Sequence, residues 1–156
     1  MIDEVVEMSA NIDDMTGQDL GAAMDILFKE GALDVWFEHI QMKKNRPAVK
    51  LSLIVRPGEE KRIANVVLKH TTTLGVRMHR CTRVIMERET EVVRMGLGDV
   101  RIKKGLMNGS VVKEMPEYED VLRISCETGK PLAEVRSEIM STKKKYEKDM
   151  KYKEGD

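Results

Sequence analysis

Alternation of hydrophobic and polar residues predicts four strands in the first half of the chain. Four segments share this pattern: residues 5–12, 32–42, 49–55 and 76–87. In the first of them, every second residue from Val6 to Ile12 is apolar, which is typical of a strand with one buried face. A charged turn at 43–47 separates the second and third strands, so these two segments predict a β-hairpin.

Two segments between these strands repeat their apolar residues at helical spacing. Leu20, Met24 and Leu27 mark a helix that ends before Gly31, and residues 59–70 form a second amphipathic segment. The element order is therefore β-α-β-β-α-β, which predicts a ferredoxin-like fold of the α+β class.

The second half of the chain predicts a small β extension followed by helices. Short strands are expected at 89–95, 100–104 and 110–114, and helices at 121–127 and after Pro131. We expect one domain over residues 3–140, with the ferredoxin-like core at 3–88 and the extension with its helices at 89–140. The highly charged residues 141–156 have little to bury and are expected to be frayed.

Composition excludes several broad classes of protein. The chain has 156 residues, of which 41% are hydrophobic, so it can bury a core of its own. Its formal net charge is zero, which argues against binding to nucleic acids or membranes through a general basic excess. The distant Cys81 and Cys126 do not form a disulfide framework, and the acidic N-terminus does not resemble a signal peptide. These features predict a cytoplasmic protein.

The first cluster of candidate functional residues follows the first strand, at 11–16. Asp13 and Asp14 are hard oxygen ligands of the kind that Mg²⁺ or Mn²⁺ prefers, often shared with substrate phosphates. Ordinary capping of the following helix by Asp14 or Thr16 is the alternative explanation.

Two further clusters could bind an anion. The turn that contains Lys43, Lys44 and Arg46 concentrates positive charge that suits phosphates, although a solvated hairpin tip would have the same sequence. Residues 71–77 combine three threonines, a glycine and Arg77, which could cradle an anion or simply form a loop after a helix.

A fourth candidate cluster lies at 115–120 and contains Glu117 and Asp120. The alternative explanation is that these acids only stabilise the start of a helix. Other familiar sites are missing from the sequence. There is no P-loop motif, and the three histidines and two cysteines do not show the spacing of a transition-metal site.

A series of motifs resembles one known family. The strings are N-I-D-D-M-T-G-Q-D-L-G at 11–21, G-A-L-D-V-W at 31–36, Q-M-K-K-N-R-P at 41–47, T-T-T-L-G-V-R at 71–77, K-E-M-P-E-Y-E-D at 113–120 and K-P-L-A-E-V at 130–135. Together they resemble the C-terminal domain of the nickel insertion proteins that mature the lactate racemase cofactor. The resemblance covers residues 3–140.

The resemblance implies a CTP-binding domain of a CTP-dependent nickel insertase, a lyase-class chelatase that completes a nickel-pincer nucleotide. Nickel would be the substrate metal, CTP would bind with Mg²⁺ or Mn²⁺, and the domain would form a homo-oligomer. The family's larger N-terminal domain is not part of this sequence, so either a separately encoded partner supplies it or the chain is a fragment of a longer protein. The chain alone could then bind CTP without catalysis; a non-catalytic ligand sensor or oligomeric regulatory module is the alternative.

Placed on these motifs, residue chemistry suggests a role for each candidate. Asp13 and Asp14 would hold the metal. The triphosphate would contact Lys43, Lys44, Arg46, Thr72, Thr73 and Arg77, and the ribose or base would contact Asn11, Asn45, Glu117 and Asp120.

Overall fold

The computed structural model describes residues 1–96 and 98–153, with backbone only for 147–153. The chain divides into two compact units, Met1–Ile85 and Met86–Asp156. Each unit contains one antiparallel sheet and two α-helices, so the predicted α+β class is confirmed.

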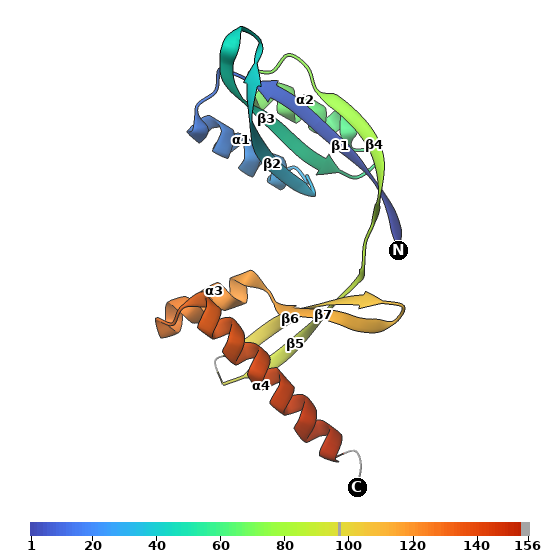
Figure 1. Cartoon of the computed structure of the whole chain (residues 1–156), viewed down its shortest axis with the longest axis vertical. Helices are drawn as coiled ribbons and strands as arrows, with labels where there is room; N and C mark the ends of the chain where they lie inside the picture. Colours follow the sequence, from blue (N-terminus) through green and yellow to red (C-terminus); the bar gives the residue numbers. More distant parts are fainter. Residues whose placement is uncertain (97, 154–156) are drawn as a thin grey trace. The chain divides into compact units, whose positions relative to one another are not determined.

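The first unit has the predicted βαββαβ order. Its elements are β1 (Ile2–Ile12), α1 (Gly17–Lys29), β2 (Asp34–Met42), the short 3₁₀ turn η1 (Lys43–Asn45), β3 (Arg46–Val55), α2 (Glu60–His70) and β4 (Arg77–Val84). The strands lie in the order β2-β3-β1-β4, and every neighbouring pair is antiparallel (Figure 1). This is the split βαβ arrangement of ferredoxin-like domains.

Both helices of this unit cover the same face of the sheet. Met8, Leu53 and Val35 lie opposite one another in β1, β3 and β2, and all three are buried. Leu27 of α1 and Val67 of α2 belong to the same apolar cluster. Complete burial of each such side chain contributes roughly 1.5–3 kcal/mol, so this layer is the main source of the unit's stability.

The second unit is a three-stranded sheet with two helices. It contains β5 (Glu87–Met95), β6 (Gly98–Met107), β7 (Ser110–Pro116), α3 (Tyr118–Thr128) and α4 (Leu132–Lys153), and the strand order is β5-β6-β7. Val100 and Ile102 of β6 pack with Ile124 of α3 and Ile139 of α4. Gly129 ends α3 in the left-handed conformation, as a helix-terminal glycine does.

The C-terminal segment differs from the expected frayed tail. Helix α4 continues to Lys153, and residues 154–156 lie outside the described part of the chain. The side chain of Lys143 is only 2% exposed, and its ammonium lies 2.8 Å from Glu114 and 3.7 Å from Glu91. One residue of this lysine-rich run is thus buried against carboxylates of the sheet. Among the described residues, no helix is both long and apolar enough to cross a lipid bilayer.

Candidate functional site

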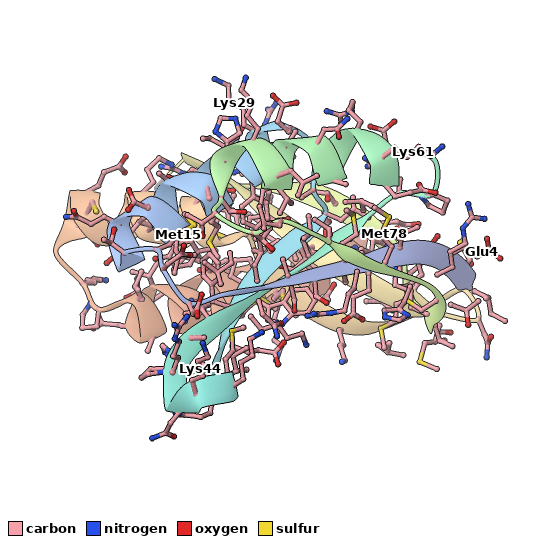
Figure 2. All side chains as sticks on the ribbon, turned by 90° about the horizontal axis from the view of Figure 1, so that it is seen from above. Glu4, Met15, Lys29, Lys44, Lys61 and Met78 are labelled. Carbon is pink, nitrogen blue, oxygen red and sulfur yellow. The ribbon has the colours of Figure 1, made fainter. Side chains whose placement is uncertain are left out.

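The candidate residues of the first unit gather at one end of its sheet. β1 ends there, and because it is antiparallel to β3 and β4, both of these strands begin there. The β2–β3 hairpin turns at the same end, since Met42 pairs with Arg46. Figure 2 shows Lys44 at the tip of this hairpin. The fold thus brings together the three clusters that the sequence carries at 11–16, 43–46 and 71–77.

The hairpin tip presents two unpaired cations. Lys43 and Lys44 are exposed, and within the described part of the chain neither forms an ion pair. Lys44 and Asn45 have φ values of 61° and 57°, the left-handed conformation that tight hairpin turns require and that asparagine tolerates better than lysine. The amide of Gln41 donates a hydrogen bond of 2.7 Å to Asn45 Oδ1 and so supports this turn.

The two aspartates after β1 have separate partners. Arg46 Nη1 donates to Asp13 Oδ2 at 3.0 Å, and the hydroxyl of Thr72 donates to Asp14. Thr16, rather than Asp14, caps helix α1 by accepting a hydrogen bond from Asp19 N at 3.2 Å. Helix capping therefore does not account for either Asp13 or Asp14.

Arg77 is fixed on the sheet face that the helices leave open. Its Nη2 donates to Asn11 Oδ1 at 2.6 Å and its Nε donates to Ser9 Oγ at 3.2 Å. Thr73 uses its hydroxyl inside its own loop, where it donates to the Gly75 carbonyl at 3.0 Å. Of the two predicted threonines, Thr72 is thus the one that contacts another candidate cluster.

The carboxylates at this end can hold a metal only with help from a ligand. Among the side chains described, those of residues 1–96 and 98–146, no group of three or more His, Cys, Asp or Glu is placed to hold a metal ion. Asp13 and Asp14 supply two carboxylates, and Mg²⁺ commonly completes such a set with waters and substrate phosphates. These two carboxylates could therefore supply only part of the ligands of a divalent ion.

Glu117 and Asp120 belong to the second unit, where both carboxylates form ion pairs. Glu117 lies 3.1 Å from Lys103 Nζ. Asp120 accepts from Arg101 Nε and from the Arg101 backbone N–H, both at 2.9 Å. These hydrogen bonds from Arg101, helped by its charge, lower the pKa of Asp120. The observed contacts give Asp120 a structural role, namely joining the start of α3 to β6.

Replacing Asp120 by asparagine is expected to lower the free energy of unfolding by about 1–2 kcal/mol at neutral pH. Because the folded-state pKa is depressed, the ionised carboxylate stabilises the fold above its unfolded-state pKa of about 4 and loses this effect as the pH falls further. Urea unfolding at pH 7 and in steps below pH 4 should show the difference between wild type and Asp120→Asn shrinking with acid. A difference that stays constant would contradict the assignment.

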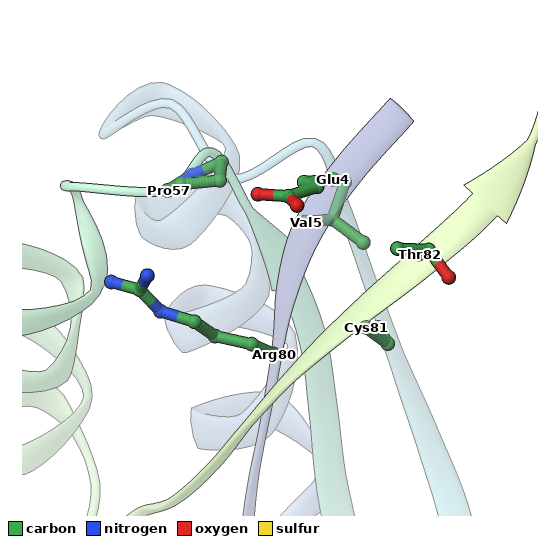
Figure 3. Close-up of a pocket in the computed structure, with 6 residues that line it drawn as sticks. All are labelled: Glu4, Val5, Pro57, Arg80, Cys81 and Thr82. Atoms are coloured by element: carbon green, nitrogen blue, oxygen red, sulfur yellow. The ribbon is translucent and has the colours of Figure 1, made fainter. Parts of the chain in front are cut away.

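A larger hollow of the first unit lies at the opposite end of the sheet. It has a volume of about 540 Å³ and is lined by Glu4, Val5, Pro57, Arg80, Cys81 and Thr82 (Figure 3). Arg80 is paired with Glu60 at 3.2 Å. Without a cluster of free cations, this hollow does not suit a triphosphate, and its size alone does not make it the functional site.

A smaller hollow lies beside Asp13. It has a volume of about 170 Å³, and its lining comes from β1, the loop before α1, and the β2–β3 hairpin: Ile12, Asp13, Met15, His39, Pro47, Ala48 and Val49. Sequence reasoning missed His39, because it considered histidines only as metal ligands. The available signal was its position near the end of β2, on the same strand face as Phe37.

Comparisons with known proteins identify the family of this chain. Residues 1–136 match the family model described as nickel insertion protein. A pyridinium-3,5-bisthiocarboxylic acid mononucleotide nickel insertion protein of Alkaliphilus metalliredigens is 41% identical over 136 residues, covering 87% of this chain and 32% of that protein. Its counterpart in Acetivibrio thermocellus is 38% identical, over 85% of this chain and 32% of its own length.

A solved structure matches across nearly its whole length. It is described as LarC2, the C-terminal domain of a cyclometallase involved in the synthesis of the NPN cofactor of lactate racemase, in its apo form. The TM-score is 0.84 at 36% identity, covering 90% of this chain and 97% of that one. This chain spans about a third of the length of the curated relatives that it matches. The chain belongs to the nickel insertion protein family.

Proposed function

We propose that the first unit binds CTP together with Mg²⁺ or Mn²⁺, as the nucleotide-binding part of a CTP-dependent nickel insertase. The observation that carries the proposal is the meeting of free cations and two carboxylates at one end of the sheet. Lys43 and Lys44 provide positive charge and have no ion-pair partners among the described residues. Asp13 and Asp14 directly follow β1 at the same end of the sheet and contact Arg46 and Thr72. Such a pairing suits a metal-bound triphosphate.

Each residue contributes in a way that follows from its contacts. Asp13 and Asp14 would hold the divalent ion, which offsets part of the triphosphate charge. Arg46 donates a hydrogen bond to Asp13 in this structure. If Asp13 binds a metal ion instead, the guanidinium of Arg46 becomes available to a phosphate. Arg77 and Thr72 complete the polar rim, with Asn11 orienting Arg77.

Nickel enters the proposal as a substrate rather than as a resident ion. The relatives are named for inserting nickel into pyridinium-3,5-bisthiocarboxylic acid mononucleotide. We propose that this chain acts in the same reaction with the larger region present in those relatives, supplied on the same or another polypeptide. Assembly into a homo-oligomer is part of the proposal, because β2 and β4 are sheet edges that a neighbouring copy could cover.

Thermal melts with CTP, UTP, ATP and GTP, each with Mn²⁺, Mg²⁺ or EDTA, test the proposal. A ligand that binds only the folded state adds about 2.7 kcal/mol at a hundredfold excess over its dissociation constant. The expected result is a rise in melting temperature with CTP and metal that EDTA abolishes. A protein that does not respond to any nucleotide would favour the non-catalytic alternative.

Replacing Asp14 by asparagine is expected to weaken binding of metal-bound CTP at least tenfold, equivalent to about 1.4 kcal/mol. Asparagine keeps the shape and can still bond Thr72, but it loses the charge that a divalent ion requires. Titration calorimetry with CTP and Mn²⁺ measures the change. Asp25→Asn, on the exposed face of α1, is the matched control. Unchanged affinity in Asp14→Asn would remove this residue from the metal site.

A further inference from the structure

A small hollow lies beside Asp13, between the end of β1, the start of β3 and the loop before helix α1, which begins at Gly17. Met15 packs against the apolar core and forms one wall, while Pro47 and Val49 form another. The resulting space has a volume of about 170 Å³.

The lining of this hollow suits a flat heterocyclic ring. Ile12, Met15, Pro47 and Val49 give it apolar walls, and a methionine adapts its shape readily to a ring. His39 is an exposed residue in the lining, and its ring nitrogens can donate or accept a hydrogen bond at the edge of such a ring. Apolar walls with a few polar groups are typical of small-molecule sites.

The position of the hollow matches the two parts of a nucleotide. Asp13 lines the hollow and also bonds Arg46 at 3.0 Å, so the hollow opens beside the cations of the hairpin. If the phosphates of a nucleotide bind outside the hollow, against Lys43 and Lys44, its base can reach the apolar walls of the hollow. The volume is too small for a whole nucleotide and is sufficient for one ring.

We propose that this hollow holds the base of the bound nucleotide, and that His39 determines which base is accepted. The inference rests on the proposed function, because it takes the phosphate and metal site at the same end as given. It adds a specificity-determining residue that acts separately from the phosphate contacts. A pyrimidine would fit, and its edge would meet the imidazole.

The test measures affinities for CTP, UTP and inorganic tripolyphosphate, each with Mn²⁺, by titration calorimetry. In His39→Ala we expect CTP to bind about tenfold more weakly and the preference for CTP over UTP to fall to less than twofold. Tripolyphosphate binding should stay within twofold of wild type. His39→Gln keeps a hydrogen-bonding group and should recover part of the preference. His79→Ala, an exposed histidine on the other edge strand β4, is the matched control.

The outcomes separate this inference from the proposed function. Retention of the full CTP preference in His39→Ala would overturn the base role while leaving the phosphate site intact. Equal affinity of the wild-type protein for CTP and tripolyphosphate would do the same, since no base would then be held. If wild type binds neither ligand with metal, the proposed function fails and the base site fails with it. Circular dichroism of each variant confirms that the fold is retained.

Discussion

Replacing Lys43 and Lys44 together by alanine is expected to lower the affinity for metal-bound CTP about a hundredfold. Each lysine is exposed at the hairpin tip without an ion pair in the described part of the chain, so its charge is available to the triphosphate. Loss of about 1.4 kcal/mol from each contact gives this factor if the two losses add. Calorimetric titration of CTP in the presence of Mn²⁺ gives the dissociation constants.

Salt dependence supplies a second readout for the same variant. Added salt screens exposed charges, so wild-type affinity should fall as ionic strength rises, and the double variant should respond less. Lys61→Ala with Lys69→Ala removes the same charge from exposed positions of α2 and serves as the control. An equal loss of affinity in both double variants would show that only net charge matters, not the hairpin tip.

Replacing Lys143 by alanine is expected to lower the free energy of unfolding by about 3 kcal/mol. The ammonium is buried between Glu114 at 2.8 Å and Glu91 at 3.7 Å, and Lys104 lies 2.9 Å from Glu91. Without Lys143, the two partly buried carboxylates share the positive charge of Lys104 only. Breaking a buried ion pair in this way costs about 3–5 kcal/mol. The lower end applies because both carboxylates keep some exposure.

Urea unfolding followed by circular dichroism measures this change. Lys144→Ala, at the next and exposed position of α4, should change stability by less than about 0.5 kcal/mol. Trp36 is the single tryptophan and lies in the first unit, so its fluorescence reports on that unit alone. If Lys143→Ala behaves like Lys144→Ala, the buried ion pairs do not stabilise the second unit.

The first unit could be predicted from sequence because each strand buries one face. Alternation from Val6 to Ile12 and helical spacing in α1 both follow from this burial, and the resulting order has few possible topologies. The fourth strand was predicted too long: β4 ends at Val84, opposite Ile2 at the start of β1, and a new sheet begins at Glu87.

The role of Lys143 could not be predicted, because residues 143–145 are all lysines. Which of them is buried depends on how the helix is rotated against the sheet, and composition carries no information about that rotation. The same holds for Glu117 and Asp120. Their acidic character indicated the start of a helix. Their partners Lys103 and Arg101 lie on strand β6, and the packing of α3 against that strand determines which residues pair.

The candidate site was predictable to the level of its clusters but not of its contacts. The sequence marked polar clusters at 11–16, 43–46 and 71–77, and the antiparallel pairing of β1 with β3 and β4 brings these three to one end of the sheet. The fourth cluster, at 115–120, lies in the second unit. The bond from Arg46 to Asp13 depends on the left-handed turn at Lys44, and the hollow at His39 lies between the end of β1, the start of β3 and the loop before α1. Neither follows from residue spacing.

The chain enters and leaves the first unit at a single end of its sheet. Ile2 pairs with Val84, and the amino group of Met1 donates to the Ile85 carbonyl at 3.0 Å. The loops of the candidate site close the other end, where there is no covalent connection to the rest of the chain. These loops can therefore gain or lose residues without displacing the polypeptide on either side. Ligand selectivity can diverge among relatives here while the anchoring of the unit stays constant.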